Sequence, residues 1–212
     1  MRACNKHLLV FLFALLFFSC STLNNHKPCL DTNFPGCSLA RQLWQEAIDT
    51  VVLKNFPNKY KWYKAVVWDD SYDNAWVSKG REVNITKQFI SKINYEKVLA
   101  VAAHELAHLQ LGHYYARNGI IILNSPEKKL RFDGKPPSNV PVKIVGNIVV
   151  PKGFGDYQEQ EADVQALIYL KSIGVKPKIY LDLLNLFVLH SSNKAIEERI
   201  QFLKGYLKKN PK

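Results

Sequence analysis

The sequence VAAHELAHLQLGH, residues 101–113, is the most informative stretch of the chain. It belongs to an apolar region, residues 95–113, that lacks Pro and is expected to form one long, mostly buried helix. On such a helix, His104 and His108 lie one turn apart and face the same way. Two imidazoles placed like this can bind one metal ion, and Glu105, about 100° further round, would lie beside an open coordination position.

The residue types in this stretch suit a catalytic zinc ion. Zinc lowers the pKa of a bound water to about 7, and Glu105 is placed to accept the proton that this water releases. The alternative is a pair of core histidines with satisfied hydrogen bonds. A His-Glu pair inside an apolar helix is, however, costly to bury unless something binds it.

A catalytic zinc needs a third protein ligand, and the segment QEQEAD, residues 158–163, can supply it. Glu159 and Asp163 are four residues apart at the start of a predicted helix, so they share one face. One can bind the metal while the other accepts a hydrogen bond from a ligand histidine and fixes its tautomer. Glu161 points elsewhere and is not expected to be a ligand. Taken alone, these acids could equally complement the helix dipole.

The rest of the chain predicts an α+β fold, in which a small antiparallel sheet packs on the His104 helix and on several further helices. Residues 63–68 are β-branched and aromatic, and a hairpin is indicated where two short strands flank Lys79-Gly80. Residues 142–150 read as one strand, or as two bent at Gly146. Further helices are expected at residues 39–52 (N-cap Ser38, ended by Pro57), 156–173, 178–190 and 193–207.

Together these motifs resemble the HtpX-type gluzincin zinc metallopeptidases, which include the periplasmic BepA and LoiP proteins and the CAAX prenyl proteases. The resemblance covers about residues 40–210. It rests on HELAHLQLGH at residues 104–113, on the Glu-x-x-x-Asp pattern of Glu159 and Asp163, and on three upstream matches: Asn74-Ala75-Trp76, Gly80 and Val83-Asn84-Ile85-Thr86.

The resemblance implies a zincin-like metallopeptidase domain over residues 38–212 with one Zn²⁺ per chain. It implies that the metal ligands are His104, His108 and Glu159, and that the general base is Glu105. It also implies two supporting residues, Asp163, which would support His104, and His113. It also implies an edge strand beside the cleft, with which an extended substrate can pair: Asn74, Ala75, Val83 and Ile85.

Two features depart from the family pattern. The family has a His-Pro pair six residues before a helical Arg near the C-terminus. Arg199 fits the Arg, but Asn193 stands where the His is expected. His190 lies close but out of register: it could be a latent metal ligand, a group that stabilises the transition state, or a helix-end residue. The long Pro-rich connection, residues 112–154, cannot be aligned and could be a lid or substrate loop.

Residues 1–19 have the pattern of a secretory signal, with a basic start followed by an apolar run, residues 8–18. The run ends beside Cys20, as in a lipoprotein signal, so lipid would be attached to Cys20 and residues 20–37 would form a tether. An ordinary cleaved signal or an uncleaved anchor is the alternative.

Cysteine usage agrees with export. Cys29 and Cys37 can form a disulfide across a short loop, as expected in an oxidising compartment; two free thiols are the alternative. These features predict a periplasmic protein anchored by lipid to a bacterial membrane, the outer one being favoured. The formal charge is +11, but aromatic residues do not interleave with the basic ones, so no nucleic-acid partner is expected.

The predicted function is hydrolysis of internal peptide bonds in unfolded or extended proteins, which the resemblance connects with quality control in the cell envelope. The alternative is a non-catalytic zinc-binding chaperone or adaptor of the envelope. A fourth protein ligand, such as His190, would favour that alternative because closed zinc sites are structural. A membrane-embedded prenyl-peptide protease is not expected, since the apolar run at residues 8–18 is too short to span a bilayer as a helix.

Overall fold

The structure is a computed structural model that describes residues 27–29, 36–117, 142–145, 148–151, 154–190 and 194–210. The elements follow one another in this order: α1 (Cys37–Asn55), a short 3-10 helix (Pro57–Lys59), β1 (Lys64–Trp68), β2 (Ala75–Ser78), β3 (Glu82–Thr86), α2 (Lys87–Lys92), α3 (Tyr95–Gln110), α4 (His113–Arg117), β4 (Val142–Val145), β5 (Ile148–Pro151), α5 (Asp156–Ser172), α6 (Pro177–His190) and α7 (Lys194–Lys209).

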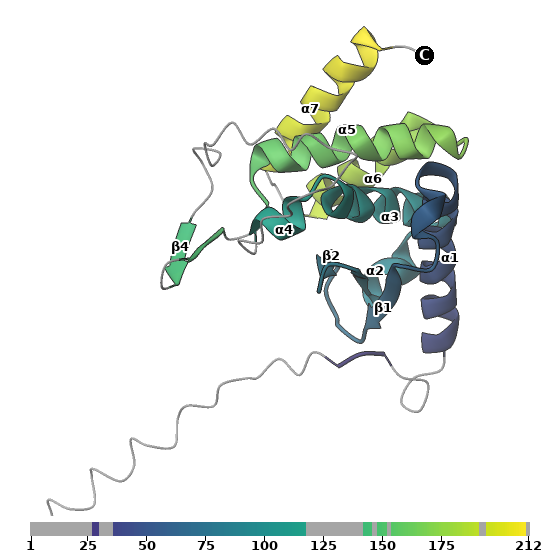
Figure 1. The fold of residues 1–212 in the computed structure, drawn as a ribbon. Coiled ribbons are helices and arrows are strands. Elements are labelled where there is room, and N and C mark those ends of the chain that lie inside the picture. The colour runs from purple at the N-terminus through teal and green to yellow at the C-terminus, as the bar shows by residue number, and fades with distance from the viewer. Residues whose placement is uncertain are drawn as a thin grey trace, which may run out of the picture.

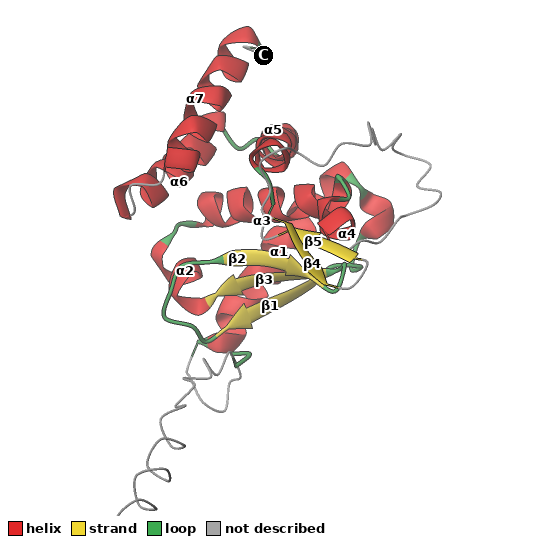
Figure 2. Ribbon diagram, turned by 90° about the vertical axis from the view of Figure 1, so that its left-hand side faces the viewer, coloured by secondary structure: helices red, strands yellow, loops and turns green. Residues whose placement is uncertain are grey.

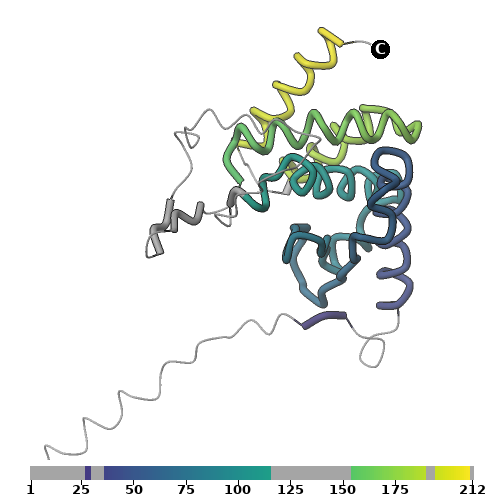
Figure 3. The backbone as a smooth tube through the Cα atoms, in the orientation of Figure 1, coloured from purple at the N-terminus to yellow at the C-terminus, as the bar shows by residue number. Residues whose placement is uncertain are grey.

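Helix α3 lies at the centre of the fold, between the sheet on one side and α5 on the other (Figure 2). Helix α1 packs against β1 and α3 (Figure 1), and α3 and α5 run side by side (Figure 3). Most of α3 is buried, including Val98, Ala102 and Leu106. A helix that is apolar nearly all round can be stable only where other elements cover every side of it. The composition of α3 therefore explains its central place.

The three-stranded sheet is mixed, with the strand order β1-β3-β2. Strand β2 pairs antiparallel with β3 as the hairpin pattern predicts, but β1 pairs parallel with β3. The prediction of an antiparallel sheet is therefore wrong for β1. After β1 the chain reverses direction and forms β2, which is not a neighbour of β1. The chain then reverses again, and β3 occupies the position between β1 and β2. Local alternation identifies strands but does not say which strands become neighbours.

The edge-strand prediction is also wrong for Val83 and Ile85. Both lie on β3, whose backbone is paired on both sides, and both side chains are fully buried. The edge strand on the cleft side is β2, which begins at Ala75. A strand between two neighbours has no free backbone groups to offer a peptide, so only an edge strand can accept one.

Residues 27–29 cover the opposite edge of the sheet. Pro28 forms an antiparallel bridge with Trp68, and the Cys29 N–H donates to the Val67 carbonyl oxygen at 2.8 Å. The Asp69 N–H donates to the Lys27 carbonyl oxygen at 3.0 Å. The last part of the predicted tether is thus part of the fold. Within the ranges described above, β2 is the strand of this sheet whose outer edge carries no neighbour.

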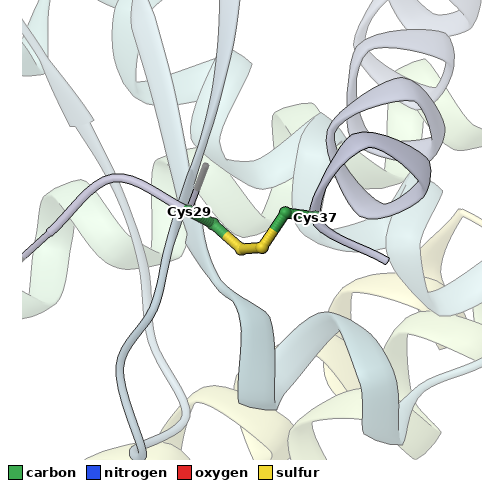
Figure 4. Close-up of a disulfide and its surroundings, with 2 residues drawn as sticks. All are labelled: Cys29 and Cys37. Carbon is green, nitrogen blue, oxygen red and sulfur yellow. A yellow bond between two sulfur atoms is a disulfide. The ribbon is translucent and has the colours of Figure 1, made fainter. Parts of the chain in front are cut away.

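The predicted disulfide between Cys29 and Cys37 is present, with a Cα–Cα distance of 5.5 Å (Figure 4). Cys37 begins α1 and is fully buried, and Cys29 lies on the segment paired with β1. The bridge therefore ties the covered sheet edge to the first helix. Cys20 and the predicted signal lie outside the described residues.

Three further elements differ from the predictions or extend them. The predicted helix over residues 95–113 is interrupted: α3 ends at Gln110 and α4 begins at His113, because Gly112 adopts a left-handed φ of 78°. Short helix α2 was not predicted. Residues 142–150 form two strands, β4 and β5, paired antiparallel.

None of the described helices is long and apolar enough to cross a membrane.

Replacing both bridged cysteines by alanine is expected to lower the free energy of unfolding by about 2–3 kcal/mol, because the loop is short and the bridge restricts the unfolded chain. Urea unfolding monitored by circular dichroism would measure the change. Reductant should destabilise the wild type by a similar amount and leave the Cys29→Ala/Cys37→Ala variant unchanged. Equal midpoints for wild type and variant under oxidising conditions would contradict the prediction.

Candidate metal centre

Three potential ligand side chains converge from two helices. His104 and His108 project from α3, and Glu159 projects from the first turn of α5. The two Nε2 atoms are 3.1 Å apart. Glu159 Oε2 is 3.3 Å from His104 Nε2, and Glu159 Oε1 is 3.6 Å from His108 Nε2. The packing of α5 along α3 thus brings together residues that are far apart in the sequence.

This arrangement fits a metal ion. Ligands about 2.0–2.2 Å from a tetrahedral ion are separated by about 3.4 Å, which is close to the observed spacings. One ligand atom from each residue lies within 4.8 Å of the others. Two imidazole nitrogens and a carboxylate are ligands that zinc accepts. The three residues can therefore hold one ion and leave a fourth position for water or substrate.

Asp163 and Tyr180 orient His104 from behind. His104 Nδ1 is 3.2 Å from Asp163 Oδ1 and 2.8 Å from the Tyr180 hydroxyl, which donates to Asp163 Oδ1 at 2.6 Å. With a proton on Nδ1, His104 can donate to either oxygen and keep the Nε2 lone pair directed at the site. Asp163 is fully buried, so these contacts are protected from water.

Arg199 of α7 completes the support. Its Nε donates to Asp163 Oδ2 at 2.8 Å, its Nη2 donates to Asp163 Oδ1, and its Nη1 lies 2.9 Å from Glu159 Oε2. Burial alone would raise the pKa of Asp163, but Arg199 and His104 lower it well below its usual range. Asp163 is therefore a stable anion, and one guanidinium fixes two carboxylates of α5.

The electrostatic environment favours a positive charge at the ligand position. Burial would lower the pKa of His104, yet Asp163 and Glu159 outweigh burial and raise it to about 9. The same carboxylates that stabilise a protonated imidazole also stabilise a bound cation. This preference is a second reason why the site suits a metal.

Glu105 has the environment of a proton acceptor that works near neutral pH. Its side chain is nearly buried and lines the same cleft as the three ligands. Burial raises the pKa of Glu105 to about 7, with a further upward contribution from Glu159 and a downward one from His104. A general base is most effective when its pKa lies near the working pH.

His113 lies next to His108 rather than in the ligand cluster. Its Nδ1 is 3.0 Å from His108 Nδ1, and its Nε2 is 3.2 Å from Glu161 Oε2. Both ring nitrogens of His113 thus face other partners than the metal position. His190 is the last residue of α6, and its side chain lies outside the described part of the chain.

A cleft of about 840 Å³ opens above the ligands. Strand β2 and the residues before it form one wall, which includes Asn74, Ala75 and Trp76. Helix α6 contributes apolar side chains to the other wall, including Leu183 and Phe187. The cleft therefore has an edge strand beside the potential metal position.

The sequence model of peptidase family M48 matches residues 39–207. The chain belongs to peptidase family M48. The match includes both α3 and the start of α5, which carry His104, His108 and Glu159, the three residues that could hold a metal ion. A comparison with curated proteins gave no significant match.

The sequence does not predict the contacts that three further residues make with the histidines of this M48 site. Tyr180 links His104 to Asp163 from α6, Phe154 stacks on the His108 ring, and Glu161 contacts His113. A lone Tyr or Phe carries no motif. Glu161 stands within QEQEAD, but helical spacing turns it away from Glu159, and its partner is known only once α4 is placed.

Asp163→Asn is expected to weaken zinc binding about 10–100-fold, because the neutral amide loses the charge that orients His104 and holds Arg199. Competition with a chromophoric chelator would measure the affinity. Asp182→Asn is the matched control, since Asp182 is a more exposed carboxylate on α6 that contacts Lys178. An unchanged affinity in a folded Asp163→Asn protein would contradict the assigned role.

Proposed function

We propose that this protein is a zinc-dependent endopeptidase that hydrolyses internal peptide bonds of extended or unfolded proteins. The observation that carries the proposal is the convergence of His104, His108 and Glu159, with Glu105 next to them in an open cleft. Membership of family M48 supports the reaction class. A purely structural zinc site would have no use for a nearly buried carboxylate with a pKa near 7.

His104, His108 and Glu159 would hold one Zn²⁺. When bound, zinc would supply an acidified water and a positive charge that polarises the scissile carbonyl. Asp163, Tyr180 and Arg199 would keep the ligands oriented by the contacts described above. The proton transfers of the reaction would be carried out by a protein side chain, that of Glu105.

Glu105 would act twice in the reaction. It would first accept a proton from the attacking water, which increases the nucleophilicity of the oxygen. It would then deliver that proton to the amide nitrogen, which leaves as an amine when the C–N bond breaks. A carboxyl group with a pKa of about 7 can do both near neutral pH.

The substrate would lie in the cleft as an extra strand along β2. That wall is lined by Asn74, Ala75, Trp76 and Ser78, and the outer backbone edge of β2 could pair with an extended peptide whatever its sequence. The apolar wall formed with α6 would receive side chains. Most backbone groups of a folded protein are already paired with one another, so unfolded or extended chains are the proposed substrates.

The rival function is a zinc-binding chaperone or adaptor of the cell envelope without peptidase activity. His190 as a fourth ligand would favour it, because it would close the coordination sphere. The position of Glu105 favours the enzyme. Envelope quality control remains a proposal that rests on the resemblance and on the export signals.

Digestion of casein by residues 21–212 with zinc tests the proposal. The wild type should cleave casein, and Glu105→Gln should bind zinc but lose at least about 100-fold in rate, because it lacks the proton acceptor. Gel electrophoresis with time would measure cleavage. His108→Ala should lose both zinc and activity. Full zinc occupancy without cleavage by the wild type would favour the adaptor.

We also propose that the protein is exported and anchored by lipid at Cys20 to a bacterial membrane, with its domain in the periplasm. The disulfide at Cys29 and Cys37 supports an oxidising compartment. Labelling cells with a radioactive fatty acid should mark the wild type and the Cys4→Ala control but not Cys20→Ala. Label on Cys20→Ala, or none on the wild type, would refute the lipid anchor.

A further inference from the structure

A continuous chain of side-chain contacts leads from His108 to the surface. His108 Nδ1 is 3.0 Å from His113 Nδ1, and His113 Nε2 is 3.2 Å from Glu161 Oε2. The Tyr157 hydroxyl donates to Glu161 Oε1 at 3.0 Å. Both imidazoles are buried, whereas the side chain of Glu161 is 40% exposed. We refer to His108, His113 and Glu161 as the relay.

The backbone break after α3 makes the relay possible. On a continuous helix, His113 would lie about 140° round the axis from His108, so the rings could not meet. The left-handed Gly112, with φ 78°, starts a new helix at His113 and directs its ring back toward His108. The ring of Phe154 stacks on the ring of His108, with the two ring centroids 3.8 Å apart and the ring planes inclined by 11°. The plane of the His108 ring is thereby fixed.

The contact between two Nδ1 atoms restricts where the protons can be. For a hydrogen bond between neutral rings, one Nδ1 must carry a proton and the other a lone pair. If His108 Nδ1 donates, His113 carries its proton on Nε2 and donates to the Glu161 carboxylate. His108 Nε2 then has a lone pair directed at the metal position.

The opposite arrangement is unfavourable. If His113 Nδ1 donated, its Nε2 lone pair would face a Glu161 oxygen at 3.2 Å, so two acceptors would be in contact. His108 would then carry its proton on Nε2, where it would block metal binding. That proton could be donated to His104 Nε2, which is 3.1 Å away, or to Glu159 Oε1, which is 3.6 Å away. The contact with Glu159 is too long for a strong hydrogen bond. A bond to the neutral His104 ring is weaker than the charge-assisted bond from His113 Nε2 to the Glu161 carboxylate, which this arrangement loses. The carboxylate of Glu161 therefore favours the first arrangement.

We propose that Glu161, acting through His113, sets the tautomer of His108 so that Nε2 is ready to bind the metal before the metal arrives. This inference deepens the proposed function, because it assumes that His108 is a ligand of the same zinc site. Glu161 and His113 are positioning residues: neither contacts the substrate or the metal. The two histidine ligands thus have separate supports, Asp163 with Tyr180 for His104 and the relay for His108.

The tautomer can be observed directly in zinc-free protein by two-bond ¹H–¹⁵N NMR of labelled histidines. The wild type should show the proton of His108 on Nδ1 and that of His113 on Nε2. Glu161→Lys presents a donor where an acceptor is needed, so it should reverse both tautomers. A proton on Nε2 of His108 in the wild type would overturn the proposal.

Zinc affinity provides a second readout. Glu161→Lys should bind Zn²⁺ at least about 10-fold more weakly than wild type, whereas Glu161→Gln, which keeps an acceptor oxygen, should stay within about threefold. Asp156→Lys is the charge-matched control, because Asp156 is an exposed acid on the same helix, and it should also stay within about threefold.

The conservative variant His113→Asn keeps an acceptor oxygen for His108 and should retain more affinity than His113→Leu. Equal affinities for Glu161→Lys and Asp156→Lys would overturn the proposal. The tautomer measurement needs no bound zinc and no cleavage. A protein without peptidase activity but with the expected tautomers would therefore refute the proposed function and leave the relay intact.

Discussion

The carboxylate of Asp163 is the point at which four helices meet. It lies on α5 and accepts hydrogen bonds from Arg199 on α7 and Tyr180 on α6, while His104 on α3 contacts it through Nδ1. A fully buried anion is tolerated only when such partners compensate its lost hydration. Because the partners come from separate helices, the helices cannot shift independently without leaving this charge uncompensated. The same contacts that fix the helices therefore fix the ligand geometry.

The metal centre depends on this arrangement in two ways. His104 and His108 are placed by helical periodicity, but Glu159 approaches them only because α5 lies along α3. Arg199 then connects Glu159 with Asp163, so the ligand carboxylate and the supporting carboxylate are held together. Glu105 lies beside this network in the cleft. Burial is the main reason why the pKa of its carboxyl group is raised to about 7. The geometry of the potential ligands, the pKa of Glu105 and the packing of the helices thus depend on one set of interactions.

The described part of the sheet has one edge that is covered and one edge that lies beside the cleft. Residues 27–29 occupy the outer side of β1 and are held there by the Cys29–Cys37 bridge, while β3 is enclosed between β1 and β2. Strand β2 is left beside the cleft. A covered edge offers no unpaired backbone groups to other chains, so pairing with another chain is possible only at the edge that is left uncovered. That uncovered edge lies next to Glu105 and the three potential metal ligands.

The sequence by itself determined what depends on local periodicity. One helical turn separates His104 from His108, and another separates Glu159 from Asp163, so each pair shares a face in any structure that keeps those helices. Tertiary structure alone decided that β3 is central, that Gly112 redirects His113, that Tyr180 contacts His104 and that Glu161 contacts His113. Apart from the turn at Gly112, these features join residues far apart along the chain. Their energies depend on burial and on the approach of separate elements, which no local pattern of residues encodes.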